Sequence, residues 1–167
     1  MFVRAKKIKD SKYAYLVQNS WKGKKVSQKV KKYLGKIVFM DDEYLLNFKN
    51  VEEYDWNLPL KLLFREIISN EFICRGFIRK TWCLIKNDLQ INLSTGKITQ
   101  NGVSVVLFIN GRYLYDKLLL NIQNFYHKDS DDEIERGKTL AQLFSDAGIN
   151  ISKEVFIQLY KKINADE

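Results

Sequence analysis

The alternation of hydrophobic and polar residues at the start of the chain predicts β-strands. Three runs, residues 2–9, 13–21 and 24–37, alternate with a period of two and are separated by turn-forming residues. This spacing predicts a three-stranded antiparallel meander. In the second run, one face is expected to carry Tyr13, Tyr15, Val17 and Trp21. In the third run, one face is expected to carry Lys25, Ser27, Lys29, Lys31 and Tyr33, and the other Val26, Val30 and Leu34.

The apolar face of such a meander needs a cover. Three strands bury only one face, so we expect the rest of the chain to supply a helix or a second sheet. A helix is predicted soon after the meander, with Asn57 as its N-cap and Pro59 in its first turn. Residues 72–109 return to the strand pattern and predict three or four antiparallel strands, with residues 103–109 as a buried central strand.

The last third of the chain has helical periodicity. One helix follows the turn at residues 110–111, and a second is expected to begin at Ser130 and end at Gly148, with Glu133 completing a capping box. A third begins at Ser152. Strands, a helix, more strands and C-terminal helices predict an α+β fold. The expected organisation is a basic β-sheet module at residues 1–38, an acidic connection at residues 39–55 and an α+β domain at residues 56–167.

Charge is distributed unevenly along the chain. The net charge is +8, but the first 36 residues hold twelve basic residues and one acid, a net +11, whereas the rest holds sixteen basic and nineteen acidic residues, a net −3. Lysines concentrated in a short module suit a polyanion, because each one placed near a phosphate releases counterions. The alternative is a solvated lysine-rich face, although ordinary surfaces mix both signs.

The aromatic residues of this module are interleaved with its lysines, as on surfaces that stack nucleobases. Together these features predict a nucleic-acid-binding site composed of Arg4, Lys6, Lys7, Lys9, Lys12, Tyr15, Trp21, Lys22, Lys24, Lys25, Lys29, Lys31, Lys32 and Tyr33.

No pattern in the sequence predicts an active site. The Gly-Lys pair at residues 96–97 lacks the neighbours of a phosphate-binding loop and reads as a hairpin turn. The acids of residues 129–133 lack the spacing of a calcium loop and suit a helix start. His127 has no sequence partner for a triad, and Cys74 and Cys83 are expected to be buried reduced thiols. We therefore predict no catalytic residue, metal site or cofactor.

The chain has no apolar run near the roughly 18 residues of a membrane span, and its first residues lack the apolar core of a signal peptide. We expect a cytoplasmic protein without a membrane partner.

The start of the chain resembles that of insertion-sequence transposases of the IS4/IS1634 type. The resemblance covers about the first 38 residues, with Met-Phe-Val-Arg-Ala-Lys-Lys-Ile-Lys at 1–9, Tyr-Ala-Tyr-Leu-Val at 13–17, Gly-Lys-Lys-Val-Ser-Gln-Lys-Val at 23–30 and Tyr-Leu-Gly-Lys at 33–36. In those enzymes it is a small β-module ahead of the catalytic core, but no catalytic acid triad follows here. Residues 108–111 and 147–156 are similar to archaeal proteins that carry the same module, which implies an archaeal origin and no activity.

The expectation from these features is a non-enzymatic nucleic-acid-binding protein. The transposase resemblance alone favours duplex DNA over structured RNA. The alternative is a protein–protein adaptor or ribosome-associated factor that docks a partner, or a second copy, through the C-terminal helices. A nuclease is the third possibility.

Overall fold

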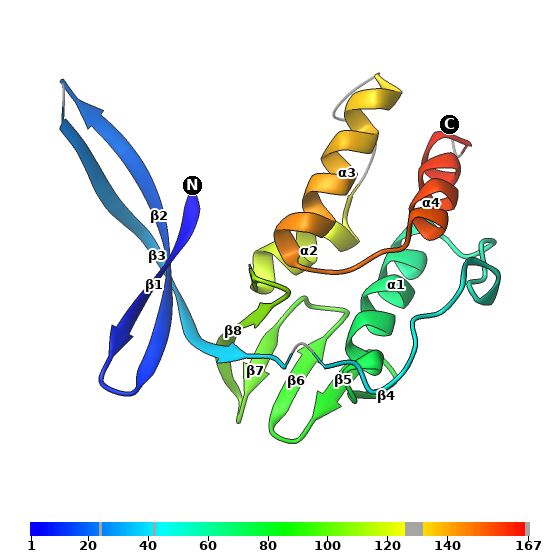
Figure 1. Cartoon of the computed structure of the whole chain (residues 1–167), viewed down its shortest axis with the longest axis horizontal. Coiled ribbons are helices and arrows are strands. Elements are labelled where there is room, and N and C mark those ends of the chain that lie inside the picture. The colour runs from blue at the N-terminus through cyan, green and yellow to red at the C-terminus, as the bar shows by residue number, and fades with distance from the viewer. Residues whose placement is uncertain (24, 42, 126–131, 166–167) are drawn as a thin grey trace.

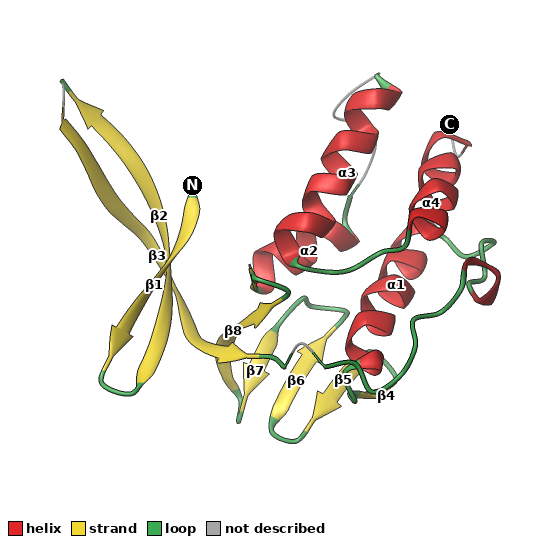
Figure 2. Cartoon of the chain, in the orientation of Figure 1, coloured by secondary structure: helices red, strands yellow, loops and turns green. Residues whose placement is uncertain are grey.

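The computed structural model describes residues 1–23, 25–41, 43–125 and 132–165. Within these ranges the chain forms four α-helices and nine strands, and the predicted α+β order is confirmed (Figures 1 and 2). The strands are β1 (Phe2–Ile8), β2 (Ser11–Lys22), β3 (Lys25–Phe39), β4 (Ile78–Lys80), β5 (Cys83–Lys86), β6 (Leu89–Asn92), β7 (Ile98–Gln100), β8 (Val103–Ile109) and β9 (Arg112–Leu114). The helices are α1 (Leu60–Cys74), α2 (Asp116–Gln123), α3 (Glu133–Ala147) and α4 (Lys153–Ala165), with a short 3₁₀ helix at Val51–Glu53.

All described strands belong to one sheet. Its order is β1-β2-β3-β8-β7-β6-β5-β4, and β9 pairs with β8. The predicted N-terminal meander forms as antiparallel pairs, but it is not a separate three-stranded sheet. Strand β3 runs on to Phe39 and pairs in parallel with β8 over Lys36–Phe39, because the apolar residues of that stretch continue the strand pattern. All other pairs are antiparallel.

The four helices lie on the same side of strands β4–β8 (Figure 2). The main core is formed between them, with Phe64 of α1, Phe144 of α3 and Leu159 of α4 all buried against strand residues such as Leu107. Five short strands, rather than three or four, occupy residues 78–109. Helix α1 continues to Cys74, so Phe72 is a helical core residue and not the start of a strand.

Two helix starts differ from the prediction. The N-cap of α1 is Pro59 and not Asn57, since the extended backbone at Pro59 leads directly into the first turn. The N-cap of α3 is Asp132, whose side chain accepts a backbone hydrogen bond from the first turn, and the predicted Ser130 lies outside the described residues. The predicted end of α3 is confirmed, because Gly148 takes the left-handed conformation with φ of 67°.

A buried polar network, which the sequence pattern did not predict, joins four separate parts of the chain. Arg75 Nε donates to Glu71 Oε1 over 3.0 Å, and the two side chains are 1% and 0% exposed. Arg75 Nη2 donates to the Tyr44 hydroxyl and to Asn110 Oδ1, both at 2.7 Å. Glu71 Oε2 accepts from the backbone N–H of Asn150 at 3.1 Å. The network ties the segment after β3, the end of α1, the β8–β9 turn and the link between α3 and α4.

Replacement of Arg75 by Leu is expected to lower the free energy of unfolding by about 3–5 kcal/mol, because Glu71 then remains buried without its counter-charge. Urea denaturation followed by tryptophan fluorescence measures the loss. Arg79→Leu is the matched control: its pair with Glu66 is about a quarter exposed, so the loss should be below about 1 kcal/mol. Equal losses in the two variants would contradict the structural role of the network.

Candidate nucleic-acid interface

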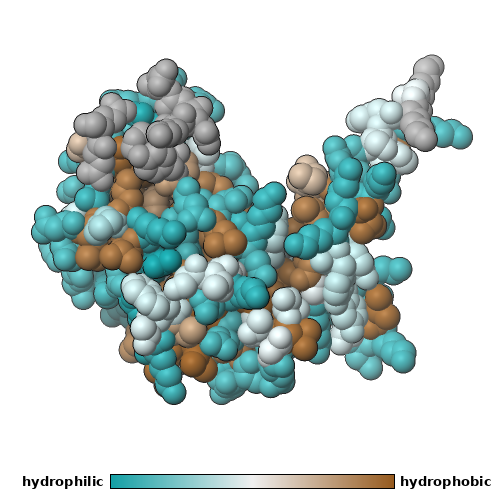
Figure 3. Space-filling model, turned by 180° about the vertical axis from the view of Figure 1, so that it is seen from behind, coloured by the Kyte–Doolittle hydropathy of each residue, from teal (hydrophilic) through white to brown (hydrophobic). Residues whose placement is uncertain are grey.

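The first three strands form an arm (residues 1–39) that projects from the remainder of the protein, which we call the body (residues 43–165). Pairing of β1 with β2 reaches only from Ile8↔Ser11 to Phe2↔Val17. Beyond that point residues 18–22 of β2 and 25–29 of β3 pair only with each other and form a two-stranded ribbon. The ribbon stands clear of the body (Figures 1 and 3).

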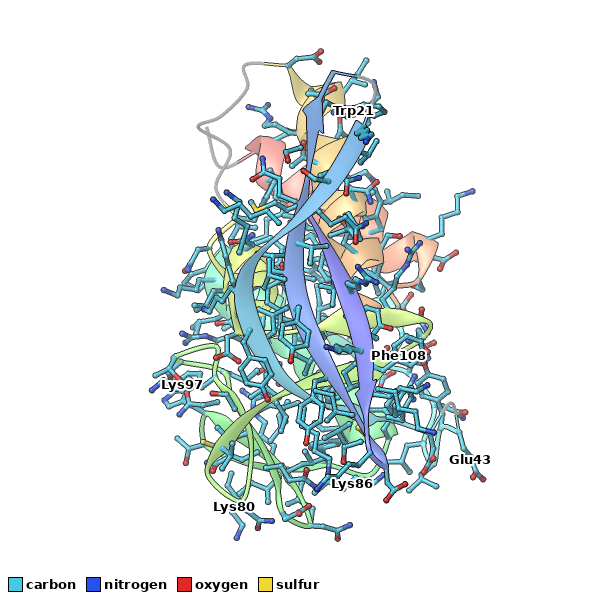
Figure 4. The ribbon with its side chains drawn as sticks, turned by 90° about the vertical axis from the view of Figure 1, so that its left-hand side faces the viewer. Trp21, Glu43, Lys80, Lys86, Lys97 and Phe108 are labelled. Atoms are coloured by element: carbon cyan, nitrogen blue, oxygen red, sulfur yellow. The ribbon has the colours of Figure 1, made fainter. Side chains whose placement is uncertain are left out.

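The predicted cover over the apolar face is absent from the described structure. Val26 is 50% exposed, Val30 58% and Trp21 72%. Gln18 and Ser27 on the other face are exposed as well, so both faces of the ribbon meet solvent. Trp21 lies near the free end of the arm, far from Phe108 at its base (Figure 4). The expectation of one buried face was therefore wrong, because the body reaches only the base of the arm.

Two irregularities in β3 change which residues share a face. The register with β2 shifts between Ala14/Tyr15 and between Leu16/Val17, which leaves Leu34 and Lys31 as extra residues of β3. Residues directly opposite each other across two strands share a face. The lysine face therefore carries Lys7, Lys12, Gln18, Ser20, Lys25, Ser27, Lys29 and Lys32. The opposite, aromatic face carries Arg4, Lys6, Tyr13, Tyr15, Trp21, Val26, Val30, Tyr33 and Lys36.

Strict alternation along β3 was thus wrong for three residues, Lys31, Tyr33 and Leu34, the last being the extra residue at the other bulge. Lys31 is the extra residue at one bulge and is replaced by Lys32 as the neighbour of Lys29 on the lysine face. Tyr33 lies opposite Tyr15 and belongs to the aromatic face. The extra residue Lys31 reverses the side chains that follow it, and the extra residue Leu34 restores the original alternation, because the strand period is two.

The lysines of the arm have no acidic partners among the described residues. The ion pairs in those ranges lie in the body and join Lys49 and Arg79 to Glu66, Arg75 to Glu71, and Lys138 to Glu135. The described side chains of the predicted basic residues are all exposed, and Lys9 lies at the β1–β2 turn with φ of 52°. Of the predicted set, Lys24 and the side chain of Lys22 lie outside the described part of the structure.

The tyrosines of the aromatic face form a cluster. The Tyr33 ring centroid is 5.4 Å from that of Tyr15 and 6.3 Å from that of Tyr13. Desolvation by burial, followed by the phenolate charges of Tyr13 and Tyr15, raises the pKa of Tyr33. Tyr33 is nevertheless 53% exposed, which leaves part of its ring open to a ligand.

The arm and the body approach each other closely at Gly35. Gly35 has φ of 133°, and a Cβ atom there would lie 2.6 Å from the backbone oxygen of Ser104. Beside it, Ala14, Ile37 and Val106 form a second small buried cluster. The arm therefore has a defined base and an exposed tip.

A groove lies where the arm leaves the body, and sequence reasoning did not find it. We call it the junction groove. Its volume is about 460 Å³, and the charged groups that line it are Lys32, Lys36, Lys117 and Asp116. Lys117 comes from α2, and no charge pattern near it in the sequence pointed to the arm.

Asp88, Asp116 and the turn at residues 96–97 have structural partners. Asp88 Oδ2 accepts from Asn101 Nδ2 at 3.1 Å, and Asp116 Oδ1 accepts from the backbone N–H of Ile98 at 3.0 Å. The Gly-Lys pair at 96–97 belongs to the β6–β7 connection, as predicted, where Asn92 Oδ1 accepts two backbone N–H groups. Over the described ranges, no group of three or more His, Cys, Asp or Glu side chains could hold a metal ion.

The two thiols differ in environment. Cys74 is free and buried, as predicted, and burial raises its thiol pKa. Cys83 is free but only partly buried, because β5 lies near the edge of the sheet. His127 and residues 129–131 lie outside the described residues.

No protein-family model, curated protein or solved structure matches the chain. The resemblance of residues 1–38 to a transposase module therefore stays a prediction. Among the described helices, none has the length and apolar character needed to cross a membrane.

Gly35→Ala is expected to weaken the attachment of the arm. The added methyl group meets both an unfavourable φ and the Ser104 oxygen, so the loss of stability should be about 3 kcal/mol or more. The weaker attachment should appear as faster hydrogen exchange in peptides covering residues 36–39 and 105–108. Gly23→Ala at the ribbon tip is the control, since φ there is also positive, at 60°, but no atom lies within 4 Å. The same acceleration in both variants would show that the close contact is not what fixes the arm.

Proposed function

We propose that this protein binds nucleic acid through the arm and does not itself cleave or transfer it. The observation that carries the proposal is the lysine face on a projecting ribbon, with no acidic partner among the described residues. Lysines left without counter-charges on an exposed strand attract phosphates strongly, because binding releases the counterions of the polyanion.

The shape of the ribbon supports duplex DNA as the target. The major groove of B-form DNA is about 12 Å wide and admits a two-stranded β-ribbon. The deep, narrow major groove of an RNA duplex does not admit side chains in the same way. Lys25 and Lys29 are four residues apart on one strand, so they span about 13 Å along the ribbon. Side chains at this spacing reach phosphates on either side of a groove, while Ser20 and Ser27 supply hydroxyls between them.

The distribution of charge along the chain supports the arm as the surface that first meets the nucleic acid. Residues 1–36 carry a net +11 and the rest of the chain a net −3. A polyanion is therefore attracted to the arm and weakly repelled by the body, which orients the encounter before contact is made.

Reversal of charge at Lys25, Lys29 and Lys32 to Glu tests the proposal. Binding to a short DNA duplex should weaken by more than about tenfold, and the slope of log affinity against log salt should become less steep by about three. Fluorescence anisotropy at several salt concentrations measures both, and circular dichroism checks the fold.

The matched control is the triple change Lys61, Lys153 and Lys161 to Glu, on exposed positions of α1 and α4. It alters net charge equally but leaves the arm intact, so affinity should stay near that of the unchanged protein. Equal weakening in both triple variants would mean that overall charge, and not the arm, governs binding. Unchanged binding in the arm variant would refute the arm as the site.

The absence of catalysis is a separate prediction. Purified protein should leave labelled single- and double-stranded DNA and RNA uncleaved with magnesium or manganese present. The side chains of Asp88 and Asp116 already accept hydrogen bonds that hold turns, which supports a structural role for both. If the protein cleaves nucleic acid and Asp88→Asn or Asp116→Asn abolishes the cleavage, the protein is a nuclease and the prediction is wrong.

A further inference from the structure

The junction groove forms because β3 and β8 diverge. Their parallel pairing runs from Lys36↔Val105 to Phe39↔Phe108 and stops there. On the arm side of Lys36, residues 25–35 of β3 pair with β2 on one edge only, among the described strands. The groove follows that free edge, so side chains from both faces of the arm reach it.

Both walls of the junction groove contribute aromatic residues. The arm contributes the rings of Tyr13 and Tyr33, and the body contributes Tyr115 at the start of α2. Gly35 and Ser104, whose side chain is exposed, also line the groove. The lining of the groove therefore combines aromatic residues with polar groups.

The charges in the groove favour an anion. Lys32, Lys36 and Lys117 are exposed and come from two separate elements. Among the described residues, Asp116 is the one acid that lines the groove, and one of its carboxylate oxygens accepts the backbone N–H of Ile98. Three ammonium groups against one carboxylate give a local charge of +2, which suits a phosphate.

A flat aromatic ligand that carries a phosphate is a nucleotide. The groove volume of about 460 Å³ lies within the range of about 300–1,000 Å³ that small-molecule sites occupy. A base inside a duplex cannot reach a tyrosine ring, because its neighbours cover both of its faces. The groove therefore suits a base that is outside a stack.

We propose that the junction groove holds one unstacked nucleotide, with its base against Tyr33 and its phosphate among Lys32, Lys36 and Lys117. This inference rests on the proposed function, since the lysine face brings the nucleic acid to the arm. It adds a preference for unpaired nucleotides next to a duplex. The same chemistry also fits a free nucleoside monophosphate, and the experiment separates the two sources.

The test compares two DNA probes by fluorescence anisotropy: a fully paired duplex and the same duplex with a single-stranded overhang. The overhang should bind about tenfold more tightly, the effect expected when one base stacks on an aromatic ring. Tyr33→Ala should remove this preference, and Tyr33→Phe should keep it because the ring remains.

A second pair of variants tests the body wall without altering the arm. Lys117→Ala should reduce the preference severalfold, because one of the three ammonium groups around the phosphate is lost. Lys153→Ala, an exposed lysine at the start of α4, should leave it unchanged.

The outcomes separate this inference from the proposed function. A protein that does not bind the paired duplex refutes the proposed function. Salt-dependent binding to the paired duplex with no preference for the overhang refutes the groove alone. Titration with adenosine monophosphate, followed by calorimetry, identifies the source of the nucleotide. If the monophosphate binds and Tyr33→Ala abolishes that binding, the groove is a site for a free nucleotide. If the monophosphate does not bind but the overhang is preferred, the groove is a site for the polynucleotide. No preference and no binding of the monophosphate would overturn the inference.

Discussion

The parallel pairing between β3 and β8 is the interaction on which the architecture of this protein depends. It covers only Lys36–Phe39 and Val105–Phe108, yet it joins the arm to the body as one sheet. Gly35 permits it, because any side chain there would collide with the backbone of Ser104. Since the pairing is short, the strands diverge immediately beyond it. The same constraint therefore produces both the projecting arm and the junction groove.

The two faces of the arm differ because of backbone irregularity rather than composition alone. The bulges at Lys31 and Leu34 bring Lys32 onto the face of Lys25 and Lys29, and place Tyr33 beside Tyr15. The lysine face can then attract phosphates, while the other face presents rings together with Arg4, Lys6 and Lys36. A regular strand would have mixed these groups, with Tyr33 among the lysines.

The body has a large buried core, which the tip of the arm lacks. Its main core lies between the helices and strands β4–β9, and the Arg75–Glu71 network holds the segment after β3 against α1. Fully paired polar groups of this kind specify one arrangement of the chain, because any other arrangement leaves a buried charge without a partner. The base of the arm is therefore attached to a fixed platform, while its tip meets solvent on both faces.

The sequence by itself determined the local elements and the charge of the protein. A period of two predicted the strands of the meander, helical periodicity predicted α1–α4, and the glycine at 148 marked the end of α3. These signals depend on neighbours within a few residues. The lysines of the candidate site were identified for the same reason, since their density is visible in the sequence without knowledge of the fold.

Only the tertiary structure decided which of these residues act together. Residues 36–39 and 105–108 are far apart in sequence, and no local period records that they pair. The bulges are equally hidden, because an extra residue is recognised only against the strand opposite it. Lys117 reaches the groove, and Tyr44 reaches Arg75, through contacts between distant segments. Such contacts depend on how whole elements pack, and packing depends on the complete set of side chains rather than on any single stretch of sequence.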